Sequence, residues 1–164
     1  MEKEKNARAY AVVMAGGKGD RFWPQSRLSN PKQLLRLLGN LTLIEQTIER
    51  LSAIFDYSHI IVVTNTNYVA PMRSLLSYLP QENIIGEPEG KDTAPCIANA
   101  AAYIKNTSRV PDPVLCLFPT DHIINDTVSF YDALADSLAV AEDTHHIVTI
   151  GIKPNAPMTG YGYI

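Results

Sequence analysis

Short apolar stretches alternate with amphipathic segments along most of this chain. The apolar stretches are continuous, which is typical of strands that are buried on both faces of a parallel sheet. They predict strands over residues 8–14, 59–64, 83–86, 114–118 and 147–150, with 114–118 as a central strand of the sheet.

The segments between these strands carry apolar residues at helical spacing. In the first of them, Thr42 and Glu45 also have the spacing of a capping box, which marks the start of a helix. The pattern predicts helices over residues 43–54, from 68 onward with Pro71 in the first turn, over 95–105, and from 126 or 127 onward.

This alternation predicts an α/β fold, a doubly wound and mostly parallel sheet with helices on both faces. A chain of 164 residues is long enough for one hydrophobic core, so a single domain over 1–164 is expected. In such sheets, ligands bind outside the carboxyl ends of the strands. Polar residues that directly follow the predicted strands are therefore the candidates for a functional site.

Composition and charge narrow the choice of partners. The net charge of −3 argues against a nucleic-acid surface, and no apolar run is long enough to span a bilayer. The polar amino terminus lacks the features of a signal peptide, so we expect a cytoplasmic protein. Cys96 and Cys116 show no metal-binding or redox spacing and are expected to be thiols.

The first predicted strand ends in a segment that combines glycines with positive charge. Gly16 and Gly17 leave the backbone open to a ligand, and consecutive amides can hold phosphate oxygens. Asp20 is the single carboxylate among five cations, Lys18, Arg21, Arg27, Lys32 and Arg36. The segment indicates an anion site, and the alternative is a solvated basic loop. It is neither a Walker A loop nor a dinucleotide fingerprint, because Val12 and Phe22 stand where those motifs require glycine.

Asp121 follows the strand predicted at 114–118. A carboxylate in that place can hold a divalent cation against phosphates, and the alternative is an aspartate that caps a helix or forms a turn. We expect His122 to pack or to lie beside the site rather than bind metal, because Mg²⁺ prefers oxygen. Trp23 is expected to plug the space beneath the basic loop, the alternative being a wall for a base.

Four segments, in order, resemble the signatures of sugar-nucleotide pyrophosphorylases, a family of nucleotidyltransferases. The Trp-Pro, Ser-Arg and Pro-Lys-Gln details within the first segment look like the mannose-1-phosphate guanylyltransferase branch of that family. The segments are residues 15–33, 87–95, 118–122 and 159–164.

The resemblance implies a role for each matching position. The implied roles are backbone contact with the nucleotide (Gly16, Gly17), neutralisation of the triphosphate and the departing pyrophosphate (Arg21, Lys32), the guanosine pocket (Glu87, Asp92, Thr93, Ala94), the catalytic Mg²⁺ (Asp121) and contact with the sugar (Gly162). The sequence departs from the family pattern at Asp20, where threonine is common, and at Lys91-Asp92, where Arg-Asn is common. An aspartate keeps an acceptor but loses the amide donor.

The resemblance further implies the transfer of GMP from GTP to mannose 1-phosphate, giving GDP-mannose and pyrophosphate, with Mg²⁺ as cofactor and a homodimer as a candidate assembly. Family members are considerably longer, so it implies that residues 1–164 are the amino-terminal, nucleotide-binding portion. Two alternatives stay open. One is a different sugar phosphate or nucleotide, and the other is a nucleotide-binding or regulatory module without catalysis.

Overall fold

The computed structural model describes residues 6–17, 19–37, 39–157, 159–160 and 162. The chain divides into two compact units, Met1–Asn125 and Asp126–Ile164. The first unit contains the sheet, and the second contains one long helix and the extended chain that follows it.

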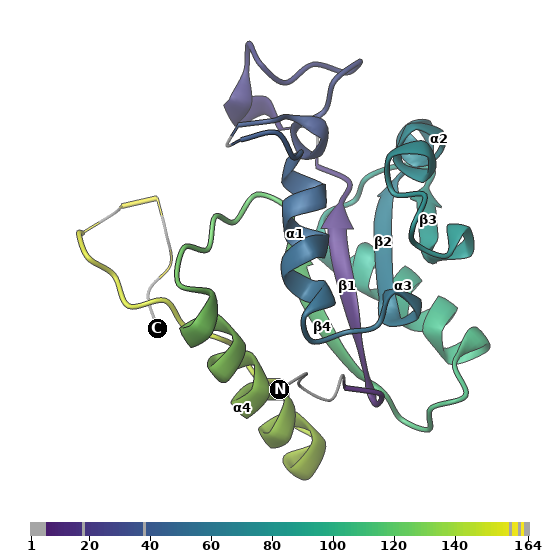
Figure 1. The fold of residues 1–164 in the computed structure, drawn as a ribbon, viewed down its shortest axis with the longest axis vertical. Coiled ribbons are helices and arrows are strands. Elements are labelled where there is room, and N and C mark those ends of the chain that lie inside the picture. The colour runs from purple at the N-terminus through teal and green to yellow at the C-terminus, as the bar shows by residue number, and fades with distance from the viewer. Residues whose placement is uncertain (1–5, 18, 38, 158, 161, 163–164) are drawn as a thin grey trace. The chain divides into compact units, whose positions relative to one another are not determined.

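The first unit is built on a four-stranded parallel sheet (Figure 1). Its strands lie in the order β3-β2-β1-β4, so that β1 pairs with both β2 and β4. Their bounds are Ala9–Ala15 (β1), Ile60–Asn65 (β2), Ile84–Glu87 (β3) and Val114–Pro119 (β4). The predicted parallel α/β fold is confirmed.

The prediction that β4 is a central strand is wrong. In the described part of the chain β4 pairs with β1 alone and forms one edge of the sheet. Its side chains are accordingly only partly buried, and Leu117 is 37% exposed. The error has a physical source, because a continuous apolar run indicates burial but does not identify which strands lie on either side.

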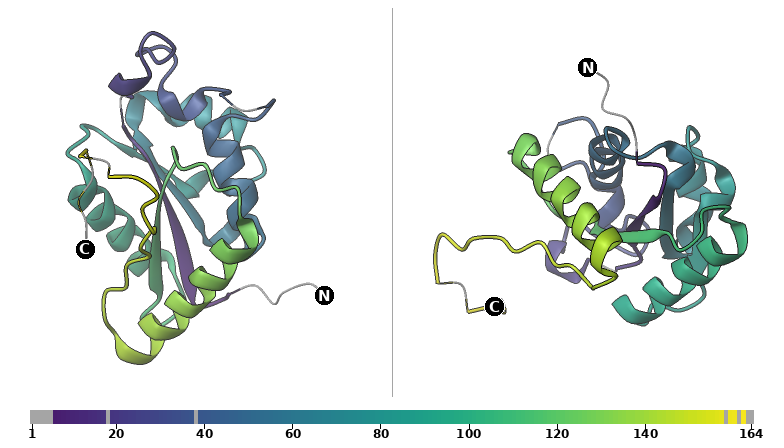
Figure 2. Two further views of the ribbon diagram at one scale, coloured as in Figure 1. Left: turned by 90° about the vertical axis from the view of Figure 1, so that its left-hand side faces the viewer. Right: turned by 90° about the horizontal axis from the view of Figure 1, so that it is seen from below.

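Helices cover both faces of this sheet. The helices α1 (Leu43–Ser52) and α2 (Thr66–Leu75) link strands that succeed one another in one direction, whereas α3 (Thr93–Thr107) returns the chain past β1. Right-handed crossovers therefore place α1 and α2 on one face and α3 on the other. Figure 2 shows the sheet lying between these helices. The described residues of this unit also form short 3₁₀ turns at Asp20–Phe22, Lys32–Leu34, Tyr57–His59 and Gln81–Asn83.

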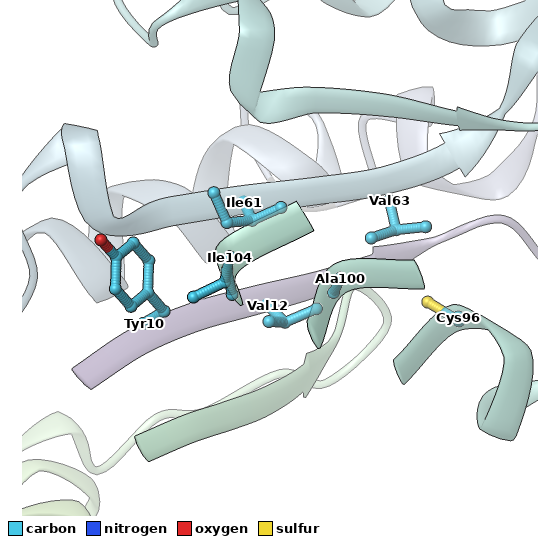
Figure 3. Close-up of a cluster of buried hydrophobic side chains, with 7 residues drawn as sticks. All are labelled: Tyr10, Val12, Ile61, Val63, Cys96, Ala100 and Ile104. Atoms are coloured by element: carbon cyan, nitrogen blue, oxygen red, sulfur yellow. The ribbon is translucent and has the colours of Figure 1, made fainter. Parts of the chain in front are cut away.

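The face covered by α3 holds a cluster of buried apolar side chains (Figure 3). On α3 its members recur at every fourth residue, and the small Ala100 lets the helix lie close to the sheet. The cluster comprises Tyr10, Val12, Ile61, Val63, Cys96, Ala100 and Ile104. Cys96 is a buried thiol, as expected.

The starts of two helices show how local hydrogen bonds set their limits. The capping box predicted for α1 is present, since the Glu45 amide donates to Thr42 Oγ1 and the Thr42 amide donates to Glu45 Oε2. The Asn65 side chain accepts from the Asn67 amide and starts α2 at Thr66. Pro71 therefore lies inside α2, and its predicted place in the first turn is wrong.

In the second unit, α4 (Thr127–Thr144) begins as predicted, with the Asp126 side chain accepting from the Ser129 amide at 3.0 Å. The strand predicted over residues 147–150 is wrong, and Ile147 is 97% exposed. A strand needs a hydrogen-bonding neighbour, and the described residues of this unit contain no other strand. No helix in the described ranges has the length and apolar character needed to cross a membrane.

We predict that Ile104→Ala lowers the free energy of unfolding by about 2–5 kcal/mol, because it leaves a cavity between α3 and the sheet. The matched control is Ile123→Ala, which deletes the same atoms from a side chain that is 57% exposed. Urea unfolding of both variants measures the difference. Equal losses would show that the cluster under α3 is not close-packed.

Candidate functional site

Loops from three strands meet beyond the carboxyl ends of β1, β3 and β4. A Cβ atom placed on Gly16, after β1, would lie 3.2 Å from Oε2 of Glu87, at the end of β3. One placed on Gly90 would lie 4.0 Å from the Gly16 carbonyl oxygen. Lys32 Nζ lies 2.8 Å from Oδ2 of Asp121, which follows β4. Residues from distant parts of the sequence therefore surround the glycine loop.

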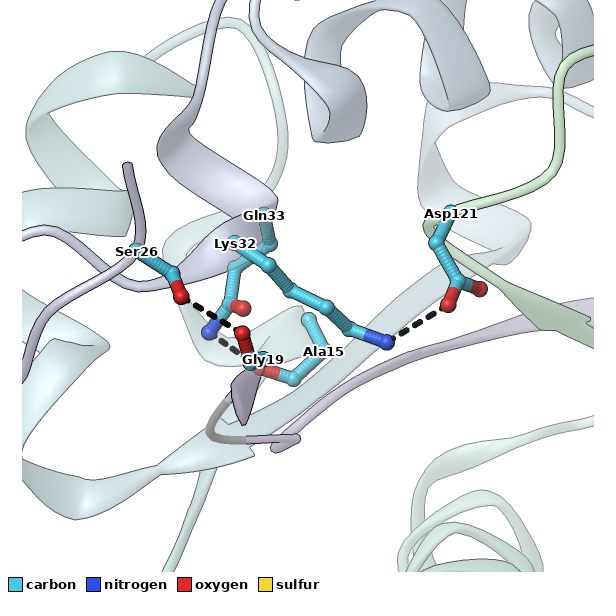
Figure 4. Close-up of polar contacts among 6 residues, drawn as sticks. All are labelled: Ala15, Gly19, Ser26, Lys32, Gln33 and Asp121. Atoms are coloured by element: carbon cyan, nitrogen blue, oxygen red, sulfur yellow. Dashed lines mark hydrogen bonds and ion pairs between the residues drawn. The ribbon is translucent and has the colours of Figure 1, made fainter. Parts of the chain in front are cut away.

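The end of β1 is fixed by two side-chain donors. The Ala15 carbonyl oxygen accepts from Gln33 Nε2 at 2.7 Å (Figure 4). It also accepts from Thr64 Oγ1 at 3.0 Å. Gln33 and Thr64 are both fully buried. The first bond joins the basic segment to β1, and the second joins β1 to β2.

Gln33 is a residue whose role sequence reasoning missed, since it entered only as one letter of the Pro-Lys-Gln motif. No local pattern singled it out, because apolar residues both precede and follow it. In the structure Gln33 is buried together with Pro31 and Leu35, whereas Lys32 and Leu34 are partly exposed. The glutamine thus anchors the turn beside Lys32, whose side chain pairs with Asp121.

The Lys32 side chain runs across the glycine loop. A Cβ atom on Gly17 would lie 3.3 Å from Lys32 Cε, and one on Gly19 would lie 2.6 Å from Lys32 Cβ. Gly19 also has a backbone φ of 75°, a conformation that side chains disfavour. The lysine can follow this path only because the loop lacks side chains there.

Lys32 and Asp121 form a partly buried ion pair, with 18% and 31% of their side chains exposed. Burial raises the pKa of Asp121, but the hydrogen bond and the charge of Lys32 outweigh it, so that the pKa lies below its ordinary value. Asp121 is therefore ionised at neutral pH. It does not cap α4, because Asp126 does, and His122 beside it is exposed.

Glu87 places a second carboxylate at the glycine loop. It is only 7% exposed, and burial raises the pKa of its carboxyl group. Burial, together with the charge of Glu87, raises the pKa of the Cys96 thiol to about 11. The Glu87 carboxylate thus lies between the glycine loop and the first turns of α3.

The structure describes the other residues implied by the resemblance in different detail. Asp92 precedes α3 with φ 63° and does not cap the helix through its side chain, and Thr93 and Ala94 form the exposed first turn. Arg21 lies in the turn Asp20–Phe22, but its side chain is outside the described part of the structure. Gly162 lies in the second unit. The roles of these residues stay predictions.

Two further expectations concern the basic loop. Lys18 lies outside the described residues. Trp23 is 74% exposed, so the prediction that it plugs the space beneath the loop is wrong. Ser26, three residues later, is 4% exposed, and its hydroxyl donates to the Gly19 carbonyl.

A divalent metal fits this site through one carboxylate. Mg²⁺ is commonly held by one or two carboxylates together with substrate phosphates. Asp121 provides such a carboxylate, although Lys32 contacts one of its oxygens. Among the described residues there is no group of three or more histidine, cysteine or acidic side chains that could bind a metal without help from a substrate.

Comparison with known proteins gives the family. The sequence matches the nucleotidyl transferase family over residues 10–164. The chain belongs to this family. It is 44% identical over 93% of its length to a mannose-1-phosphate guanylyltransferase from Escherichia coli, and 39% identical over 93% to the xanthan biosynthesis protein XanB from Xanthomonas campestris.

The chain spans about a third of the length of these relatives, 32% in both cases. A solved structure, named as a mannose-1-phosphate geranyltransferase from Thermus thermophilus, has a similar fold. It matches with a TM-score of 0.72 and 32% identity, over 83% of this chain and 39% of that protein. The fold and the family are therefore shown for the chain itself.

We predict that Gly19→Ala destabilises the protein more than Gly39→Ala. Both glycines have a left-handed backbone, with φ 75° and 73°, so both substitutions cost about 1–2 kcal/mol from the backbone. At Gly39 the added Cβ meets nothing within 4 Å, whereas at Gly19 it collides with Lys32 and costs about 1–3 kcal/mol more. Urea unfolding measures both losses, and equal values would contradict the packing of Lys32 on the loop.

Proposed function

We propose that this chain supplies the nucleotide-binding part of an enzyme that transfers GMP from GTP to mannose 1-phosphate, giving GDP-mannose and pyrophosphate. The observation that carries the proposal is the contact of Lys32 with Asp121 beside the glycine loop. It joins a candidate phosphate-binding cation and a candidate metal-binding carboxylate. The similarity to a mannose-1-phosphate guanylyltransferase supports the choice of substrates.

The phosphate chemistry needs charge compensation and alignment more than a protein nucleophile. An oxygen of the sugar phosphate attacks the α-phosphorus of GTP, and the bond to pyrophosphate breaks with its electron pair going to the leaving group. The amides of Gly16 and Gly17 hold phosphate oxygens, and Lys32 and Arg21 balance the charge that builds up on pyrophosphate. Gly162 contacts the sugar.

Enzymes of this family generally use a divalent metal, and we propose Mg²⁺ here with Asp121 as its protein ligand. When bound, such an ion polarises the phosphate oxygens and screens their charge. The pKa of Asp121 lies below its ordinary value, so its carboxylate is ionised at neutral pH, which a metal ligand requires.

The guanine base binds at the side of the site where Glu87 lies. The Watson–Crick edge of guanine carries two adjacent donors, a ring N–H and an amino group, and an ionised carboxylate accepts from both. Glu87 has a carboxyl group near the glycine loop, and in its ionised form it would accept from both donors. Asp92, Thr93 and Ala94 complete the guanosine pocket. A cytoplasmic location and a homodimer as the assembly belong to the same proposal.

We predict that Glu87→Gln lowers the affinity for GTP about tenfold or more and changes the affinity for ATP little. The amide replaces one acceptor oxygen by a donor that faces the donors of guanine, and a hydrogen bond to a charged group is worth about 1.5–3 kcal/mol. Calorimetry with GTP, ATP and UTP in the presence of Mg²⁺ measures the change.

The matched control is Glu89→Gln, which changes the same chemistry on the same loop at a side chain that is 75% exposed. It should leave all three affinities unchanged. Preference of the wild-type chain for UTP would overturn the guanine assignment. Binding of GTP without formation of GDP-mannose, where a longer relative turns over, would favour a nucleotide-binding module instead.

A further inference from the structure

Two residues with opposite proposed ligands bind each other in this structure. Lys32 is the candidate partner of a phosphate, and Asp121 is the candidate partner of a cation, yet Nζ of the lysine lies 2.8 Å from Oδ2 of the aspartate (Figure 4). The ammonium group thus occupies one of the two carboxylate oxygens that a cation could use.

The geometry leaves the lysine side chain free to exchange partners while its backbone stays in place. Gln33, the next residue, is fully buried and bonded to the Ala15 carbonyl at the end of β1. The stem of Lys32 packs on Gly17 and Gly19, so its ammonium lies between the bare loop backbone and Asp121. A rotation about the terminal bonds of the side chain moves the ammonium from the carboxylate toward the loop.

We propose that the Lys32–Asp121 pair makes the binding of phosphate and of metal depend on each other. A metal that binds Asp121 through Oδ2 displaces the lysine from that oxygen, and a phosphate that engages the lysine releases it. This inference rests on the proposed function, since it assigns the phosphate to Lys32 and the metal to Asp121.

The coupling follows from charge balance. Without ligands the two side chains neutralise each other in a partly buried place. A metal alone leaves the ammonium unpaired beside a second cation, and a phosphate alone leaves the carboxylate unpaired beside a second anion, and both situations are unfavourable. When both ligands bind, each side chain has a partner of opposite charge. Linkage then requires that each ligand raises the affinity for the other by the same factor.

The test separates the two ligands, because nucleotides chelate divalent ions in solution. Mn²⁺ alone is titrated into the chain and followed by electron paramagnetic resonance of the free ion. GTP alone is titrated in the presence of EDTA and followed by calorimetry. We expect Lys32→Met to tighten Mn²⁺ binding about fivefold and Asp121→Asn to tighten metal-free GTP binding about fivefold, the gain being limited by the partial exposure of the pair.

The first control is Arg36→Met, which removes an exposed cation from the same segment. It should leave the affinity for Mn²⁺ unchanged. If it tightens Mn²⁺ binding as much as Lys32→Met does, the effect is a long-range change in charge and the proposed exchange is overturned. The second control, Glu89→Gln, alters the exposed pair with Lys91 and should change neither affinity.

The outcomes show whether the coupling alone is wrong or the proposed function is wrong as well. Wild-type chain that binds no GTP even with Mg²⁺ would overturn the proposed function. The coupling alone would be overturned by a different set of results. In that case the wild-type chain binds GTP with Mg²⁺, but Lys32→Met weakens Mn²⁺ binding and Asp121→Asn weakens metal-free GTP binding.

Discussion

The position of the site depends on one carbonyl group, that of Ala15 at the end of β1. It accepts hydrogen bonds from two fully buried side chains, Gln33 and Thr64, which come from the basic segment and from β2. A hydrogen bond contributes about 0.5–1.5 kcal/mol, so loss of either donor would cost stability, and loss of both would leave the carbonyl without these partners. The polar segment that follows β1 is therefore held against the rim of the sheet, although few of its residues are buried.

This anchoring explains how a loop can carry precise chemistry. Lys32 directly precedes the anchoring glutamine, and its stem passes over glycines that offer no side chain to block it. Asp121 reaches the same place from β4 because parallel strands that pair in register end at one edge. The ion pair between them is thus a consequence of sheet topology combined with the bare backbone of the loop.

The features predicted most accurately from the sequence are those that depend on residue spacing within a short segment. The capping box of Thr42 and Glu45, the start of α4 at Asp126 and the parallel sheet follow from spacing and alternation. Prediction failed where the outcome depends on distant partners. The edge position of β4 and the missing strand at 147–150 depend on which neighbours are present, and the exposure of Trp23 depends on what fills the loop. The convergence of the loops was predictable, whereas the pairing of Lys32 with Asp121 was not, because no local pattern encodes it.

The charges of the first unit also favour one orientation of a nucleotide in the proposed site. Glu87 places an acceptor beside the loop at β3, whereas Lys32 places a cation beside it toward β4. A nucleotide has a matching asymmetry, with hydrogen-bond donors on a guanine base and negative charge on its phosphates. Reversing the ligand would set phosphates against a buried carboxylate, which is unfavourable because burial already raises the cost of that charge. The electrostatic arrangement therefore disfavours the opposite orientation of the proposed nucleotide, through a residue at the end of β3 and one in the turn Lys32–Leu34.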